Sequence, residues 1–245
     1  MRFLLYNIRY AAGIGKEIHF PFPYSGYFKK NNKNLLKIAA FIKKMNPDII
    51  GLVEVDSGSF RAGHRNQAEL IAEKTGCTHV YQSKYGETSF LNFVPLLNCQ
   101  GNAFLTNQKI HAENFHYFDN GVKKMVMELE LEECNIFLVH LSLKFRHRQH
   151  QLVDLYSIIK ESKKPVILAG DFNSFWGTKE LDLFLAATGL KNANVENMPS
   201  HPSRAPRRIL DFILHSPEIK ITNFEVPQVK FSDHVPLICD FEINT

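Results

Sequence analysis

The chain has 245 residues, of which 44% are hydrophobic and 22% charged, and its net charge is +4. This length fits one large α/β domain or two small ones, and it is sufficient to bury a core without disulfide support. The small positive charge is compatible with an anionic substrate, but it lacks the strong basic character of a dedicated nucleic-acid-binding domain.

The four cysteines are scattered and form no CxxC pair, which argues against a zinc site built on cysteine and against a disulfide framework. A run of about 18 apolar residues does not occur, so we expect no transmembrane segment. The apolar run near the N-terminus is too short for a signal peptide. We therefore expect a cytoplasmic monomer from a reducing compartment.

Short apolar runs alternate with amphipathic stretches, which predicts strands alternating with helices. The predicted strands are residues 3–6, 49–53, 103–106, 124–131, 136–139, 165–169, 209–214, 219–224 and 235–241. The predicted helices are residues 66–75, residues 149–160, and a first helix that begins with a cap at Asn31 or Asn32 and ends before Pro47. Residues 11–27 predict a long loop and residues 132–135 a hairpin turn. Because no low-complexity linker or sharp repeat divides the chain, we expect residues 1–245 to form a single domain.

Polar residues stand at the ends of these apolar strands or directly beside them. They are Asn7, Glu54, His140, Asp171, Asn173 and Asp211, with Asp233 and His234 immediately before the last strand. Active sites of α/β sheets gather at strand ends and in the loops beyond them, so we expect these side chains to converge.

The residue types suit the hydrolysis of a phosphate ester. Oxygen ligands without cysteine favour a hard cation such as Mg²⁺ or Mn²⁺, which can polarise a phosphoryl oxygen. A carboxylate can orient and deprotonate water, and histidines can donate hydrogen bonds to oxygens whose negative charge grows in the transition state. Nucleophile motifs built on serine, cysteine or lysine are absent, so we expect direct attack by water.

Seven short segments carry these residues, and each alone would be explained by an ordinary turn or strand end. They are residues 5–9, 47–54, 101–105, 139–141, 170–173, 210–213 and 232–237. Taken together and in this order, they resemble the motifs of the endonuclease/exonuclease/phosphatase superfamily, the metal-dependent hydrolases that include pancreatic-type deoxyribonucleases. The resemblance covers nearly the whole chain and implies an α/β fold, a four-layer α/β/β/α sandwich of two packed mixed sheets flanked by helices.

The resemblance also implies a metal site. Glu54 would be the main ligand of the ion, with Asn7 close to it. Asp233 would be a ligand of the same ion or of a second one. The implied cofactor is Mg²⁺ or Mn²⁺, and the number of ions stays open.

Catalytic roles follow from the same resemblance. Asp171 would hold or deprotonate the attacking water, and Asn173 would orient that water or bind the phosphate. His234 would contact the scissile phosphate, with its ring fixed by Asp211, because a carboxylate sets the tautomer of a histidine and favours its charged form. His140 would be a second phosphate contact.

Two basic or aromatic clusters have two interpretations each. Arg146 and Arg148, in a run with His147 and His150, belong either to a solvated helix start or to an anion clamp that binds substrate. Residues 21–30, which are rich in aromatic and basic side chains, either pack internally or grip a base, a sugar or a lipid surface. Four further histidines are expected on the surface or in the core: His64, His111, His116 and His201.

The substrate stays open at this point. Arg9 follows two places after Asn7, and histidine occupies position 140, which both depart from the pattern of abasic-site endonucleases. We favour a small or lipid-derived phosphate ester, a diester before a monoester. The alternatives are a DNA or RNA nuclease and a non-catalytic module that binds phosphate.

Overall fold

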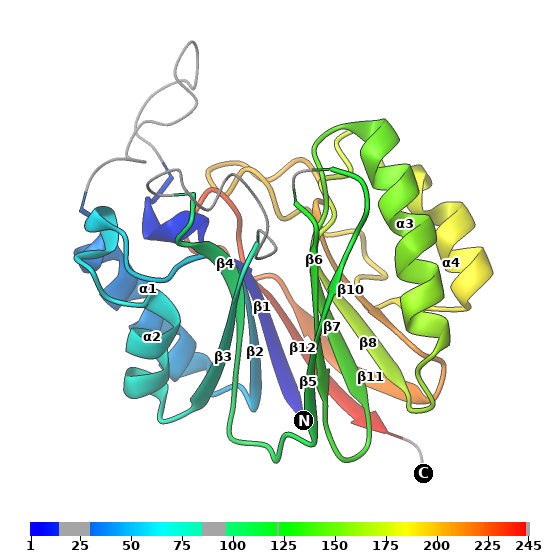
Figure 1. Ribbon diagram of the computed structural model, residues 1–245, viewed down its shortest axis with the longest axis horizontal. Coiled ribbons are helices and arrows are strands. Elements are labelled where there is room, and N and C mark those ends of the chain that lie inside the picture. The colour runs from blue at the N-terminus through cyan, green and yellow to red at the C-terminus, as the bar shows by residue number, and fades with distance from the viewer. Residues whose placement is uncertain (15–29, 85–96, 122, 244–245) are drawn as a thin grey trace.

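The computed structural model describes residues 1–14, 30–84, 97–121 and 123–243. Two six-stranded sheets face each other at its centre, and helices cover the outer face of each sheet (Figure 1). The strand order is β11-β12-β1-β2-β4-β3 in the first sheet and β5-β6-β7-β8-β10-β9 in the second. Both sheets contain parallel and antiparallel pairs. The four-layer α/β/β/α sandwich is thereby confirmed.

The elements alternate along the chain as the apolar runs predicted. The first sheet consists of β1 (Arg2–Asn7), β2 (Ile49–Asp56), β3 (Thr78–Ser83), β4 (Gln100–Thr106), β11 (Ile219–Glu225) and β12 (Leu237–Ile243). The second consists of β5 (Ala112–Tyr117), β6 (Met125–Glu130), β7 (Asn135–His140), β8 (Val166–Asp171), β9 (Lys191–Asn192) and β10 (Asp211–His215). The α-helices are α1 (Asn32–Met45), α2 (Gln67–Thr75), α3 (Phe145–Lys160) and α4 (Asp182–Thr188), and 3-10 turns lie at Arg9–Ala11, Phe60–Ala62 and Thr178–Leu181.

The two-residue repeat of the strands divides the apolar side chains between three cores. On β1, Phe3 and Leu5 pack between the two sheets, whereas Leu4 and Tyr6 pack under α1 and α2. Successive side chains of a strand point to opposite faces, so a strand buried on both faces reads as a continuous apolar run. Strand β7 divides its side chains in the same way between the inter-sheet core and the layer of α3 and α4.

Several elements differ from the sequence prediction. The edge strands β3 and β5 were missed, because their side chains are largely half-exposed or exposed and show no apolar alternation. Helix α3 begins at Phe145 rather than at residue 149, because Lys144 occupies the cap position and gives no capping signal. The hairpin at residues 132–135 is confirmed, since β6 and β7 pair antiparallel with Glu130 opposite Asn135.

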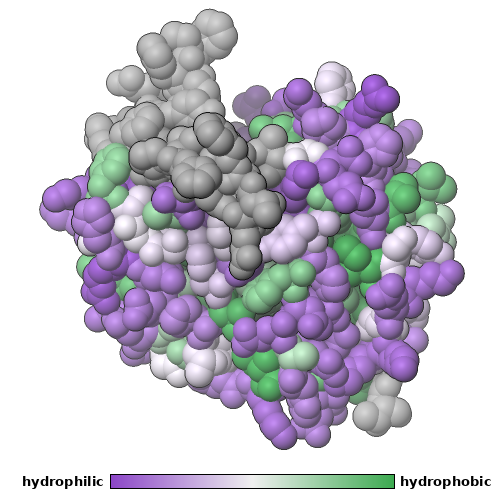
Figure 2. Space-filling view, viewed as in Figure 1, coloured by the Kyte–Doolittle hydropathy of each residue, from purple (hydrophilic) through white to green (hydrophobic). Residues whose placement is uncertain are grey.

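The described helices include none with the length and the hydropathy needed to cross a bilayer. Hydrophilic residues cover most of the face seen in Figure 2, and hydrophobic residues form small separate patches on it.

Candidate active site

Strand register brings three polar residues level at one end of the second sheet. His140 ends β7 and lies opposite Asp171, which ends β8, and Asp171 lies opposite Asp211, which begins the antiparallel strand β10. Asn7 ends β1 in the other sheet, and its Nδ2 donates a hydrogen bond of 3.0 Å to Oδ2 of Asp171. The two sheets therefore meet through polar side chains at the strand ends.

The turn after β8 depends on glycine and asparagine conformations. Gly170 has a φ of +151°, and a Cβ at this position would lie 1.9 Å from the carbonyl oxygen of Val139. Asn173 has a φ of +51°, its backbone N donates to Oδ1 of Asp171 at 2.9 Å, and its Nδ2 donates to the carbonyl oxygen of Leu141 at 2.9 Å. Asparagine tolerates the left-handed region better than most residues. The turn thus holds the Asp171 carboxylate in one orientation.

A bulge in β2 presents Glu54. The register between β2 and β4 shifts between Leu52 and Val55, and Glu54 has a φ of +59°. Bulges beside active sites commonly re-aim a side chain. The Glu54 carboxylate is 3.7 Å from Nε2 of His140, and its side chain is 18% exposed. Among the described residues, no group donates a hydrogen bond to this carboxylate.

His234 lies against Asp211 at the centre of the site. Its Nδ1 is 2.7 Å from Oδ2 of Asp211, and its Nε2 is 3.9 Å from Oδ2 of Asp171. Burial opposes the charged ring, but Asp211, Asp171 and Asp233 outweigh this effect and raise the pKa of His234 to about 10. The ring is therefore an imidazolium at neutral pH, with its Nε2–H directed away from Asp211.

Burial shifts the other two titratable groups at this end of the sheet in opposite directions. It raises the pKa of Asp171 to about 6 and lowers the pKa of His140 well below its ordinary value. Nζ of Lys123 contacts Nε2 of His140 and adds to this lowering. At neutral pH, Asp171 is thus a carboxylate and His140 an uncharged imidazole.

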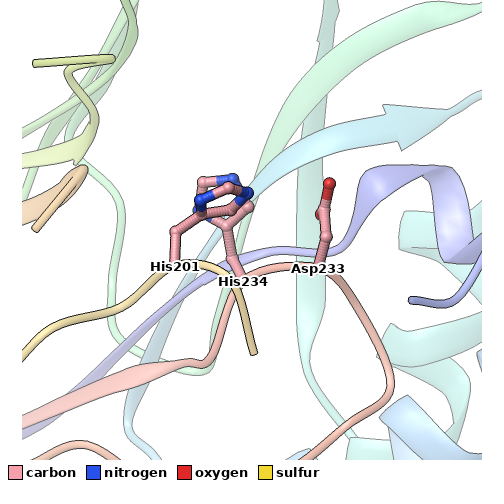
Figure 3. Close-up of side chains that lie close together, drawn as sticks. All are labelled: His201, Asp233 and His234. Carbon is pink, nitrogen blue, oxygen red and sulfur yellow. The ribbon is translucent and has the colours of Figure 1, made fainter. Parts of the chain in front are cut away.

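His201 joins the site, which the sequence did not predict. Its ring lies beside that of His234, with centroids 4.8 Å apart and planes at 51°, and Asp233 stands next to the pair (Figure 3). The Phe175 ring meets the His201 ring edge-on, with centroids 6.2 Å apart. Burial lowers the pKa of His201 to about 4, so this ring is neutral. A single histidine before a proline carried no signal of this placement in the sequence.

The sequence analysis also missed a tyrosine and two lysines near the site. Nζ of Lys84 donates a 2.7 Å hydrogen bond to the hydroxyl of Tyr10, which donates in turn to Oε1 of Gln100 at 2.8 Å. Burial lowers the pKa of Lys84 to about 7. Tyr10 and Gln100 line a cleft of about 480 Å³, and Lys84 lies behind them. The described residues that line the cleft are Asn7, Arg9, Tyr10, Glu54, Leu97, Gln100, Lys123, Leu143, Asp171, Asn173, Phe175, His201, Asp233 and His234.

The two candidate substrate-binding arginines lie elsewhere. Arg148 is buried, and its Nε and Nη2 donate to Oε2 of Glu180 at 3.0 and 2.5 Å. Its Nη1 donates to the backbone carbonyl oxygens of Ser142 and Leu143. Arg146 is exposed on α3. Neither arginine lines the cleft, and the contacts of Arg148 are those of a structural ion pair.

The aromatic and basic rim at residues 21–30 lies outside the described residues, apart from Lys30, which is exposed.

Three predicted metal ligands have different surroundings. Glu54 and the Asn7 side chain both face the cleft, and the uncoordinated carboxylate of Glu54 beside an amide oxygen is a donor set that suits a hard divalent cation. Asp233 instead lies 3.4 Å from Nε of Arg9. In the part of the chain that the structure describes, two groups have ligand atoms within 4.8 Å of one another: Asp171 with Asp211 and His234, and His201 with Asp233 and His234. Both groups need His234, whose charged ring offers no lone pair, so Glu54 and Asn7 fit a cation better.

A model of the endonuclease/exonuclease/phosphatase family matches residues 4–234. The chain belongs to the endonuclease/exonuclease/phosphatase family. Members of this family are hydrolases that act on phosphate esters and generally use a divalent metal ion.

The chain is also similar to individual proteins. A UPF0294 protein of Vibrio vulnificus strain YJ016 is 31% identical over 115 residues, which are 45% of this chain and 39% of that protein, so the chain spans less than half the length of that relative. The mannosyl-6-phosphatase Bt3783 of Bacteroides thetaiotaomicron has a similar fold, with a TM-score of 0.73 at 14% identity over 99% of this chain and 100% of that one. The catalytic domain of human Nocturnin, solved with a bound sulfate anion, gives a TM-score of 0.70 at 20% identity over 99% and 94% of the two chains.

Proposed function

We propose that this chain is a Mg²⁺- or Mn²⁺-dependent hydrolase that cleaves a small or lipid-derived phosphate ester with an activated water. The observation that carries the proposal is the arrangement around Asp171. Its carboxylate is held by Asn7 and Asn173 and lies 3.9 Å from a charged His234. A base and a hydrogen-bond donor for a phosphoryl oxygen thus stand side by side in an open cleft.

Glu54 and Asn7 would hold the ion. When bound, a divalent cation polarises a phosphoryl oxygen and stabilises charge on the leaving oxygen. The two residues come from neighbouring parallel strands, and the bulge at Glu54 turns its carboxylate into the cleft. The Oδ1 atom of Asn7 accepts one hydrogen bond, from the backbone N of Arg9, so its second lone pair can coordinate a cation.

Asp171 would orient the attacking water and accept its proton. With a pKa raised by burial to about 6, it is ionised at neutral pH but more basic than an ordinary carboxylate. Asp211 keeps His234 charged and fixes its Nδ1–H, so Nε2–H is free to donate to a phosphoryl oxygen as negative charge develops there. Neutral His140 lies 3.4 Å from the Asp171 carboxylate and would position it.

The test compares phosphate-ester hydrolysis by the wild type and by Asp171→Asn, each with Mg²⁺ or EDTA. We expect metal-dependent turnover in the wild type and a loss of about a hundredfold or more in the variant. Asp182→Asn, an exposed aspartate at the start of α4, serves as the matched control and should keep the wild-type rate. Equal rates in Asp171→Asn and the wild type would contradict the proposal. Steep salt dependence of binding to DNA or RNA would instead favour a nuclease.

A further inference from the structure

Two lysines near the cleft have no role in the reaction proposed above. Lys84 directly follows β3 and is 3% exposed, and Lys123 lines the cleft. Nζ of Lys123 contacts Nε2 of His140, which is 3.4 Å from the Asp171 carboxylate. Nζ of Lys84 donates a hydrogen bond to the hydroxyl of Tyr10, a residue that lines the cleft. The two lysines come from different sheets, because Lys84 follows a strand of the first sheet and Lys123 precedes β6 of the second.

Neither lysine has a carboxylate within ion-pair distance among the residues the structure describes. The contact of Lys84 is the neutral Tyr10 hydroxyl. The nearby arginines differ, since Arg9 lies 3.4 Å from an aspartate oxygen and Arg61 lies 2.6 Å from another. Burying a cation without a counter-ion is costly, so two such groups beside one cleft create a local demand for negative charge.

The Lys84 ammonium is held in place by a rigid partner. Tyr10 has a φ of +53°, and the guanidinium of Arg61 lies over its ring at 4.2 Å. Tyr10 and Gln100 line the cleft, so the Lys84 charge sits directly behind the cleft wall. In such a poorly solvated position a charge acts on a bound ion more strongly than it would in water.

We propose that Lys84 and Lys123 stabilise the second negative charge of a dianionic phosphoryl group, so that the site prefers a phosphomonoester to a phosphodiester. A monoester carries close to two negative charges above a second pKa of about 6, whereas a diester carries one. This inference rests on the proposed function and departs from the diester that the sequence led us to expect. The group that the site would recognise is a terminal phosphate, whether it belongs to a sugar, a nucleotide or a lipid head group.

The first experiment measures kcat/KM for p-nitrophenyl phosphate and for bis-p-nitrophenyl phosphate at about pH 6.5, where the monoester is largely a dianion. At this pH Lys84, whose pKa is about 7, is largely charged. The proteins are the wild type, Lys84→Met, Lys123→Met and the control Lys109→Met, which removes an exposed lysine outside the cleft. We expect the wild type to prefer the monoester. Each cleft variant should lose about ten- to a hundredfold on the monoester, on the scale of one charged hydrogen bond, and clearly less on the diester. A wild-type preference for the diester, or equal losses on both substrates, would overturn the inference.

A second experiment needs no turnover. Thermal melting in EDTA is followed with inorganic phosphate and with dimethyl phosphate, and the melts also show whether each variant folds. Phosphate should raise the melting temperature of the wild type and of Lys109→Met more than dimethyl phosphate does, and this difference should shrink in both cleft variants. If this holds while no ester is hydrolysed, the proposed function fails and the anion site stands. If hydrolysis occurs and the two ions act alike in the wild type, the anion site fails alone.

Discussion

Arg148→Met should destabilise the fold and should leave the KM for a phosphate ester unchanged. The guanidinium makes four hydrogen bonds of 2.5–3.1 Å, two to Glu180 and two to backbone carbonyl oxygens. Its side chain is 2% exposed and that of Glu180 6%, so the substitution leaves a buried carboxylate that has lost its cation. Breaking one partner of a buried ion pair costs about 3–5 kcal/mol. At about 2–4 °C per kcal/mol for a chain of this size, the melting temperature should fall by roughly 6–20 °C.

The assay is thermal unfolding followed by circular dichroism, together with steady-state kinetics on a phosphate ester. Arg146→Met is the matched control, because it removes an exposed arginine from the same helix, and it should melt within about 1 °C of the wild type. The double variant Arg148→Met/Glu180→Gln should lose less stability than the two single losses added, since both groups then leave together. A normal melting temperature for Arg148→Met with a raised KM would refute this reasoning and would favour the interpretation that Arg148 binds the substrate anion.

Three further predictions concern the turn, the histidine and the metal. Gly170→Ala should cost roughly 4 kcal/mol or more, because its Cβ would meet the Val139 carbonyl oxygen at 1.9 Å, and an unchanged melting curve would contradict the described turn. Asp211→Asn should lower kcat by roughly a hundred- to a thousandfold. Asp211 helps to raise the pKa of His234 to about 10 in the wild type, and the ring keeps its charge only below its pKa. The variant should therefore lose its remaining rate as the pH rises through neutrality. A pH–rate profile like that of the wild type would show that Asp211 does not keep His234 charged. Glu54→Ala should need at least about ten times more Mg²⁺ both for turnover and for the metal-induced rise in melting temperature, and identical Mg²⁺ titrations would remove Glu54 from the metal site.

The central part of the fold was accessible from the sequence because its strands are buried on both faces. Continuous apolar runs such as Ile49–Val53 and 136–139 have few other interpretations in a globular chain of this length. A polar residue directly follows each run, Glu54 after the first and His140 after the second, and parallel or suitably registered strands bring such ends together. The convergence of Asn7, His140 and Asp171 followed from that rule. Oδ2 of Asp171 lies 3.0 Å from Nδ2 of Asn7 and 3.4 Å from Nε2 of His140, which agrees with it.

Other parts of the site depend on tertiary burial, which local patterns do not carry. Lys84 and Lys123 look like ordinary surface lysines in the sequence, and only the packing of the two sheets buries Lys84 against Tyr10 and brings Lys123 against His140. His201 reaches His234 through an irregular segment without periodicity. Arg148 was indistinguishable from Arg146 until helix α3 showed that one faces Glu180 and the other faces solvent. A single domain over residues 1–245 and a cytoplasmic location stay predictions.

The most direct test of the central claim is hydrolysis of a phosphate ester in ¹⁸O-labelled water, with Mg²⁺ or with EDTA, followed by mass spectrometry of both products. The account predicts turnover only with the metal ion, with one ¹⁸O atom in the phosphate product and none in the released alcohol, because water held by Asp171 attacks phosphorus. Label in the alcohol, label-free phosphate, or the same rate in EDTA would contradict it.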